Sequence, residues 1–293
     1  MKTAQSINYQ TLGDKMRYYK KHPFSLLAAI LVGLAALITV CVLFLLVGYI
    51  LIQGIPNITP DLFAWKYTSD NVSMMPAIIN TLTMTGITLI IAVPVGVFSA
   101  IYLVEYAKRG NKIVGLVRMT TETLAGIPSI VFGLFGYLIF VIAMKFGLSM
   151  MSGALTLAIM VLPTIMRTTE EALKAVPDSY REGSFGLGAG RLRTVFRVIL
   201  PSAVPGILSG VILSIGRIVG ETAALIYTSG TVAGIPDNLM GSGRTLSVHM
   251  YALLSEGLHT EEAYATAVVL LIMVILINAL SGFAAKKIQS NKG

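Results

Sequence analysis

The sequence predicts an all-α, polytopic membrane protein with about six transmembrane helices. Of its 293 residues, 55% are hydrophobic and only 12% are charged, whereas a soluble domain has about 25% charged residues. The mean hydropathy is +0.79. So few charges give too little polar surface to cover a globule in water. A protein surrounded by lipid needs no such polar surface, so the composition favours a membrane protein. Long apolar runs and a one-sided distribution of Lys and Arg support the same class.

Each predicted span is a run of mainly apolar residues, of which about 20 cross the hydrocarbon core as a helix. The first run carries no charge and is too long for the apolar region of a cleaved signal peptide. The fourth run is shorter, so we expect its helix to continue into water. The six runs are residues 24–52, 78–104, 123–144, 153–166, 204–228 and 263–285.

The basic residues predict the orientation of the chain in the membrane. Of the 22 Lys and Arg residues, eighteen lie in the N-terminal tail, the 105–118 loop, the 167–200 segment and the C-terminal tail. Only three lie in the alternate segments, and Arg217 lies inside a span. The positive-inside rule therefore predicts a bacterial inner-membrane protein with both termini in the cytoplasm. This topology accounts for the net charge of +8 without a nucleic-acid partner.

Two segments, 53–77 and 229–262, are then expected on the outer side. Trp65 and Tyr67 are typical of interfacial anchors. The second segment contains apolar residues at helical spacing, which predicts a short amphipathic helix that packs on the bundle or docks an outside partner. The residues on this face are Leu246, His249, Met250, Leu253 and Leu254.

The segment between the fourth and fifth runs is the most informative part of the sequence. Pro177 breaks the preceding helix, and Asp178 can cap a short new one. Glycines 186, 188 and 190 allow this helix to end in a tight bend. Leu200 and Pro201 are then expected to start the next membrane helix. The pattern predicts a short exposed helix, held between two membrane helices, that transmits a partner's motion into the bundle.

This segment resembles a known signature. Importer permeases of the ABC class carry Glu-Ala-Ala, three residues, Gly, nine residues, Ile, one residue and Leu-Pro in a cytoplasmic loop. Glu182-Gly183-Ser184 occupies the triplet, Gly188 the glycine, and Val198 with Leu200-Pro201 the end, at the full spacing. The departures at positions 183, 184 and 198 are small or conservative.

The resemblance implies the type I ABC importer permease fold, with a coupling helix over about 178–189 that docks on a separate ATPase. The chain contains no Gly-x-x-x-x-Gly-Lys-Ser/Thr motif and cannot hydrolyse ATP through a P-loop. It needs no cofactor itself, and ATP is used by the partner. The implied coupling residues are Asp178, Tyr180, Arg181, Glu182, Gly183, Ser184 and Gly188.

Two charges fall inside the fifth run, at Arg217 and Glu221. Each costs about 2.5–3.5 kcal/mol near the bilayer centre, so both must face protein or water. A spacing of four residues predicts one helix face, as a structural ion pair or as a path for solute. Arg217 suits an oxyanion, and Glu221 could accept a hydrogen bond from protonated phosphate, which sulfate cannot donate. Arg167, at the inner end of the fourth run, is either a path mouth or a topological anchor.

The run Gly-Arg-Ile-Val-Gly-Glu-Thr-Ala-Ala-Leu, residues 216–225, is similar to the fifth-helix signature of the A-type phosphate permease family (PstA), and residues 125–133 are also similar. This resemblance implies phosphate import and a heterodimer with a C-type permease, with two ATPase copies and an extracytoplasmic phosphate-binding protein. The implied organisation is a basic tail (1–23), a permease domain (24–285) with its coupling loop at about 170–200, and a cytoplasmic C-tail (286–293).

The sequence is also compatible with other functions. The loop does not exclude molybdate, sulfate or phosphonate, and a proton-coupled secondary transporter could use Glu221 as its proton carrier. A membrane scaffold without a path is a third reading. An enzyme is disfavoured, because the sequence has no His-Glu-x-x-His, no Gly-x-Ser-x-Gly and no cluster with metal-ligand spacing.

Overall fold

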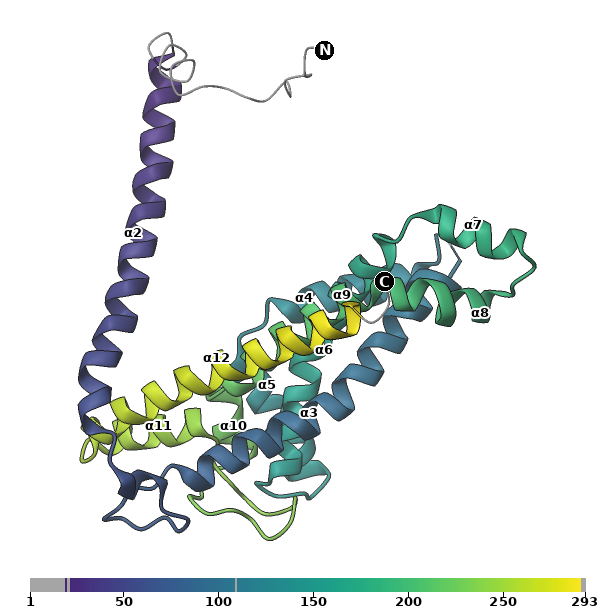
Figure 1. The fold of residues 1–293 in the computed structure, drawn as a ribbon. Coiled ribbons are helices and arrows are strands. Elements are labelled where there is room, and N and C mark those ends of the chain that lie inside the picture. The colour runs from purple at the N-terminus through teal and green to yellow at the C-terminus, as the bar shows by residue number, and fades with distance from the viewer. Residues whose placement is uncertain (1–18, 20–21, 109, 291–293) are drawn as a thin grey trace. The chain divides into compact units, whose positions relative to one another are not determined.

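The computed structural model describes residue 19, residues 22–108 and residues 110–290 (Figure 1). The chain forms two compact units, Met1–Ile52 and Gln53–Gly293. Helices make up the regular structure, and no β-strand occurs in the described residues, which confirms the all-α class. The predicted basic tail lies almost wholly outside the described part. The predicted C-tail begins within the last helix, which runs to Ser290.

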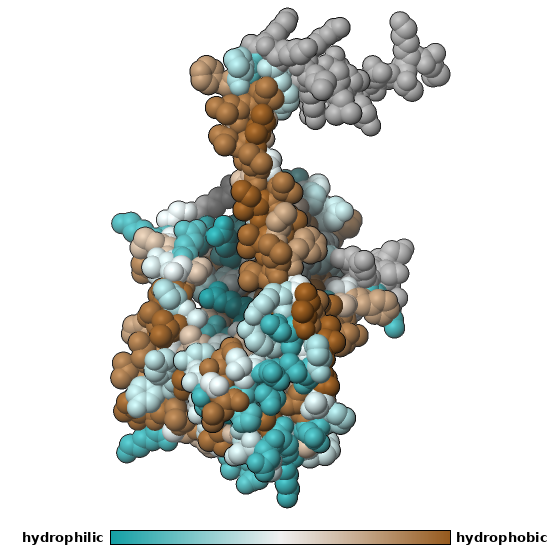
Figure 2. All heavy atoms as spheres, turned by 90° about the vertical axis from the view of Figure 1, so that its left-hand side faces the viewer, coloured by the Kyte–Doolittle hydropathy of each residue, from teal (hydrophilic) through white to brown (hydrophobic). Residues whose placement is uncertain are grey.

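The first unit consists mainly of helix α2 (Pro23–Gly54), which confirms the first predicted span. Its 32 residues carry no charge, and it appears hydrophobic along its length in Figure 2. Such a helix is about 48 Å long, more than the roughly 30 Å of the hydrocarbon core. Apolar side chains on every face suit a lipid environment rather than water.

The second unit is built around α6. The apolar stretch of α6 is 67% buried, against 33% for α3 and 22% for α12, so α6 is the central helix. Leu157, Val161 and Ile165 follow one another at four-residue spacing and are fully buried. As predicted, α6 continues beyond its apolar run, to Lys174. The long helices of this unit are α3 (Met75–Ile101), α6 (Met150–Lys174), α9 (Leu200–Val219) and α12 (Thr260–Ser290).

Helices α6 and α9 approach closely through two glycines of α9. A Cβ atom on Gly206 would lie 2.6 Å from Cβ of Ala172, and one on Gly210 would overlap the Thr168 side chain. Small residues at four-residue spacing let two membrane helices pack at short distance. This contact fixes the position of α9 against the central helix.

The third predicted span, 123–144, is not one straight helix. It is replaced by α4 (Lys112–Ala125) and α5 (Ser129–Gly136), which meet at an angle of 108°. The bend falls at Gly126-Ile127-Pro128, because Pro128 lacks an N–H and disfavours helical backbone at Ile127. The chain continues from α5 as the π-helical segment η4 (Tyr137–Ala143). With this bent pair counted as one span, the described residues contain up to six candidate spans, as predicted.

The fifth predicted span, 204–228, is also wrong as a continuous helix. Its first part begins earlier than expected, because α8 (Arg191–Thr194) and the π-helical η5 (Val195–Ile199) lead directly into α9. Its second part is interrupted, since α9 ends at Val219 and α10 (Ala223–Thr228) follows a break.

The two short helices that follow these breaks pack on each other. A Cβ atom on Gly133 of α5 would lie 2.7 Å from Cα of Ala224 in α10. One on Gly136 would lie 2.9 Å from Cγ2 of Thr228. The two interrupted spans therefore pack on each other through small residues. The contact lies in the short helices that follow the breaks at residues 126–128 and 220–222.

The predicted amphipathic helix is α11 (Leu246–Glu256), which packs on α12. Leu246, His249 and Leu253 are buried, as the spacing predicted, whereas Leu254 is 44% exposed and lies off the packed face. The remaining elements are the short 3-10 helices η1 (Ile55–Asn57) and η2 (Pro60–Phe63), the π-helical η3 (Tyr102–Tyr106) after α3, and α7 (Asp178–Gly186).

Candidate functional site

The predicted coupling segment forms helix α7 (Asp178–Gly186) between α6 and α8. Pro177 precedes its first residue, which suits a start position where the backbone is extended. The segment closes at Gly188, whose φ of +79° is a left-handed conformation that favours glycine. The prediction of a short helix followed by a tight bend is confirmed.

Most of the predicted coupling residues lie on the exposed side of this segment. The side chain of Asp178 is 79% exposed, and Tyr180 is 51% exposed. Glu182, Gly183 and Gly188 are exposed as well. This surface is free to contact another subunit.

Arg181 differs from these residues, because it points into the protein. Its Nη2 donates to Oε1 of Glu105 at 2.7 Å, and its Nε lies 3.3 Å from the same oxygen. It also donates to the carbonyls of Leu173 and Val176, both at 2.9 Å. Leu173 lies in the last turn of α6, where carbonyls lack helical partners, and Val176 follows the end of this helix. The pKa of Arg181 is raised, first by its hydrogen bond to Glu105.

Arg181 therefore fixes α7 to two other elements at once. Glu105 lies in η3, at the end of the α3 span, and its side chain is only 9% exposed. The guanidinium of Arg181 is 16% exposed. The ion pair connects α7 to the end of the α3 span, and the two carbonyl hydrogen bonds connect it to the end of α6.

Ser184 also points inward. Its hydroxyl lies 2.8 Å from the hydroxyl of Thr194, which is buried in α8. The small residue at this signature position thus holds α7 against α8. Arg181 and Ser184 attach the segment to the membrane helices, whereas the other predicted residues face outward.

Two apolar residues and one acid were missed by the sequence reasoning. Leu187 is 92% exposed and Phe185 is 46% exposed, beside the exposed polar residues of the segment. An apolar residue between glycines in a polar loop was the available signal for Leu187. For Glu105, the available signal was a lone carboxylate at the end of an apolar run. Hydropathy could not identify its partner, because Arg181 is 76 residues away in the sequence.

The two membrane charges do not share one helix face, contrary to the prediction. Arg217 lies in the last turn of α9, whereas Glu221 lies in the break before α10. No ion pair joins them in the described part of the chain. Gly220 ends the helix between them, so the four-residue spacing does not apply.

Glu221 has a structural role in this break. Its Oε1 accepts a hydrogen bond from the backbone N–H of Ala224 at 3.1 Å, which caps the start of α10. Its backbone carbonyl accepts a hydrogen bond from the hydroxyl of Ser247 in α11 at 2.5 Å. Glu221 is 8% exposed, so it joins α10 and α11 at the end of α9.

Arg217 is half-buried within a candidate span. Among the described residues, no ion pair or hydrogen bond engages its side chain. A cation left without a counter-ion at this depth is costly unless water, a solute or another subunit faces it.

Arg167 lies elsewhere, on the exposed surface of α6, where its Nε is 3.1 Å from Oε1 of Glu171. It lines a cavity of about 450 Å³ between α4, α6 and α9, which Arg217 does not line. In the same cavity, Arg118 pairs with Glu170 at 3.1 Å. The structure therefore does not bring the three predicted path residues into one cavity.

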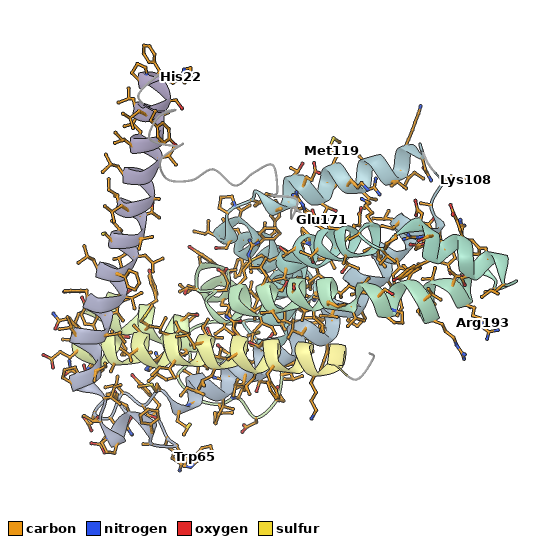
Figure 3. The ribbon with its side chains drawn as sticks, turned by 45° about the horizontal axis from the view of Figure 1, so that its top comes forward. His22, Trp65, Lys108, Met119, Glu171 and Arg193 are labelled. Carbon is orange, nitrogen blue, oxygen red and sulfur yellow. The ribbon has the colours of Figure 1, made fainter. Side chains whose placement is uncertain are left out.

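A second buried cation lies at the start of α11. Arg244 is 4% exposed, and its guanidinium lies 4.7 Å from the centre of the Tyr67 ring. The Tyr67 ring also meets His249 edge-on at 6.2 Å, so Tyr67 packs on these residues rather than acting only as an interfacial anchor. Trp65, by contrast, is 70% exposed (Figure 3). Burial lowers the pKa of His249 to about 3, with Arg244 adding to the shift and the backbone of Val72 opposing it.

A family model supports the membrane-transport assignment. The family described as binding-protein-dependent transport system inner membrane component matches residues 92–291. The chain belongs to this family. It is therefore a multi-pass component of the inner membrane and a permease rather than an enzyme, working with a separate ATPase and a substrate-binding protein.

Curated relatives cover most of the chain. The probable ABC transporter permease protein YqgI of Bacillus subtilis is 33% identical over 287 residues, which cover 90% of this chain and 97% of that protein. The phosphate transport system permease protein PstA 1 of Mycobacterium tuberculosis is 37% identical over 205 residues, covering 69% of this chain and 67% of that protein.

Solved structures agree on the fold. A chain of a bacterial ABC transporter that imports the polysaccharide alginate has a TM-score of 0.64 at 16% identity, covering 92% of this chain and 99% of that chain. A chain of the inward-facing MetNI methionine ABC transporter has a TM-score of 0.58 at 21% identity, covering 76% and 99%. The predicted type I importer permease fold is confirmed by these neighbours.

Proposed function

We propose that the chain is the A-type permease subunit of an ATP-driven phosphate importer, which moves inorganic phosphate inward by alternating access. The observation that carries phosphate as the substrate is the similarity to several phosphate transport system permeases at 32–37% identity. Arg217, which is half-buried in α9 and has no ion pair among the described residues, suits an anionic solute.

Arg217 is proposed as the residue that faces phosphate in the path. Its guanidinium offers a planar fork of donors that matches phosphate oxygens. Glu221 lies at the adjacent break, and a carboxylate that caps α10 through one oxygen retains lone pairs for a protonated phosphate. Arg167 is proposed to attract the anion at the inner mouth, in competition with its ion pair to Glu171.

The segment that begins with α7 is proposed to dock on the ATPase through its outward residues, Asp178, Tyr180, Glu182, Gly183 and Gly188. Arg181 and Ser184 then pass the motion to the membrane helices. ATP, used only by the partner, closes the ATPase dimer, moves α7 and opens the bundle outward. Hydrolysis reverses the change.

The proposed assembly is a heterodimer with a C-type permease, two ATPase copies and an extracytoplasmic phosphate-binding protein. Both termini are proposed to lie in the cytoplasm, because eighteen of the 22 basic residues then lie inside. Under this orientation α7 faces the cytoplasm, where an ATPase can reach it. Weak selectivity in the permease is sufficient, since the binding protein selects phosphate.

The test is uptake of labelled phosphate by proteoliposomes that contain the whole complex, in competition with sulfate or molybdate. We expect uptake that requires ATP inside the vesicles, survives collapse of the proton gradient and is competed poorly by sulfate. Arg217→Gln should lower it at least tenfold, whereas Lys145→Gln, at an exposed cation, should leave it unchanged. Equal competition by sulfate would exclude phosphate specificity, and uptake driven by protons without ATP would support a secondary transporter.

A further inference from the structure

A second polar cavity, of about 750 Å³, lies beside the inner side of α7 and is not part of the proposed path. Three parts of the chain form it. These are the end of the α3 span with the turn after it, the first half of α4, and a group of residues from α6, α7 and α8. Lys108 lies in the turn that leads into α4 (Figure 3).

The cavity carries more positive than negative charge. Among the residues that the structure describes, five cations line it, namely Lys108, Arg118, Lys174, Arg181 and Arg191. Three carboxylates balance part of this charge, because Glu170 pairs with Arg118 and Lys174, while Glu105 and Asp178 pair with Arg181.

Lys108 and Arg191 account for the excess. Neither has an ion pair within the described residues. The guanidinium of Arg191 lies 5.7 Å from the centre of the Tyr106 ring, which orients it without neutralising it. Both residues are exposed, so an anion that enters the cavity meets two cations without displacing an existing ion pair.

The start of α4 adds to this attraction. Asn111 caps the helix by accepting a hydrogen bond from the N–H of Ile113 at 2.9 Å. Asn111, Val114 and Gly115 line the cavity. The first turn of this 14-residue helix therefore presents its positive dipole end to the same space.

The opposite face of α4 identifies the source of the anion. Ile113, Leu116 and Met119 follow at three-residue spacing and are 69%, 58% and 59% exposed. Met119 points away from the protein in Figure 3. A bare apolar face on a helix with basic residues at its start is typical of a helix in the membrane interface. With this face toward the acyl chains, the cavity on the other side of α4 lies at the level of the lipid headgroups, where a lipid phosphate can enter it.

We propose that this cavity binds the headgroup phosphate of an anionic phospholipid, with α4 lying in the membrane interface. The assignment to the cytoplasmic leaflet rests on the proposed orientation, whereas the binding does not. The lipid would contact Lys108, Arg191 and the first turn of α4. Arg181 and Glu105 also line the cavity, so a bound lipid would lie against the inner side of α7 and restrict its movement.

The test is native mass spectrometry of the whole transport complex released from nanodiscs that contain phosphatidylcholine and phosphatidylglycerol. The variant is Lys108→Gln with Arg191→Gln. The matched control is Arg193→Gln with Arg197→Gln, which removes the same charge from an adjacent surface outside this cavity. Arg193 points away from the protein (Figure 3).

We expect the wild type and the control to retain one more phosphatidylglycerol than the cavity variant, whose affinity should fall about 30-fold for two lost cations. An excess of inorganic phosphate should not displace the lipid. Equal retention by all three proteins would overturn the proposal, as would displacement by inorganic phosphate, which would indicate a soluble anion instead. Because the readout is lipid retention, failure of phosphate transport leaves this result unaffected.

Discussion

Arg181→Met should detach α7 from the membrane helices without unfolding the protein. Arg181 and Glu105 are 16% and 9% exposed, so the substitution leaves a carboxylate mostly buried and unpaired. Removing one partner of a buried pair costs about 3–5 kcal/mol, and access of water through the adjoining cavity lowers this to roughly 2–3 kcal/mol. The carbonyls of Leu173 and Val176 also lose their donor.

Amide hydrogen exchange over residues 178–189, in the permease heterodimer before ATPase is added, measures this local cost. A loss of 2–3 kcal/mol corresponds to exchange about 30- to 150-fold faster in this segment. A double-mutant cycle with Glu105→Gln should show strong coupling, because the second substitution removes the charge that the first leaves unpaired. In the full complex, Arg181→Met should lower the phosphate imported per ATP hydrolysed more than it lowers hydrolysis.

Arg193→Met is the matched control, since Arg193 is an exposed arginine on the neighbouring helix α8. It should change neither exchange nor the transport ratio. Unchanged exchange in Arg181→Met, or additive effects of Arg181→Met and Glu105→Gln, would refute the anchoring role of Arg181.

Three further predictions concern the membrane helices and α11. Gly210→Ala should destabilise the permease by about 1–3 kcal/mol in thermal unfolding, because its Cβ would overlap α6, whereas Gly216→Ala on the same helix meets no atom within 4 Å and should not. Glu221→Gln should keep the cap of α10 and the fold but alter the preference for phosphate over sulfate; unchanged uptake and preference would reduce Glu221 to its capping role. His249 has a pKa of about 3 in the folded state, whereas in the unfolded state it binds a proton below about pH 6.5. The free energy of unfolding should therefore decrease as the pH is lowered from about 6.5 to about 3, by about 1.4 kcal/mol per pH unit. His249→Leu should remove this part of the pH dependence, and an unchanged slope would contradict the assignment.

The long spans could be predicted because each is a nearly continuous apolar run. Apolar side chains are required wherever a helix contacts lipid or is buried, as in α2, α3, α6 and α12. The breaks could not be predicted in the same way. Residues 126–128 and 220–222 lie inside the predicted apolar runs 123–144 and 204–228, and hydropathy contains no information on a bend. Pro128 and Gly220 were visible, but membrane helices also tolerate such residues without a break, as Pro94 within α3 and Pro163 within α6 show.

For the site, the sequence predicted the position of α7 but not the direction of its side chains. The signature spacing identified Arg181 and Ser184 together with the outward residues, because spacing alone does not separate the two sides of a short helix. The partners of these two residues, Glu105 and Thr194, come from η3 and α8. The pairing of Arg217 with Glu221 failed for a related reason, since it assumed that the helix continues through Gly220.

In the proposed mechanism, an ATPase acts on this chain through α7 and the residues directly after it. Site-specific photo-crosslinking from position 187 in the assembled transporter tests it most directly, because Leu187 is the most exposed large apolar side chain described in this protein. Position 251 in α11, where Tyr251 is 49% exposed, is the control. We predict a crosslink to the ATPase from position 187 and none from position 251. No crosslink to the ATPase from position 187, or one from position 251 instead, would contradict the claim.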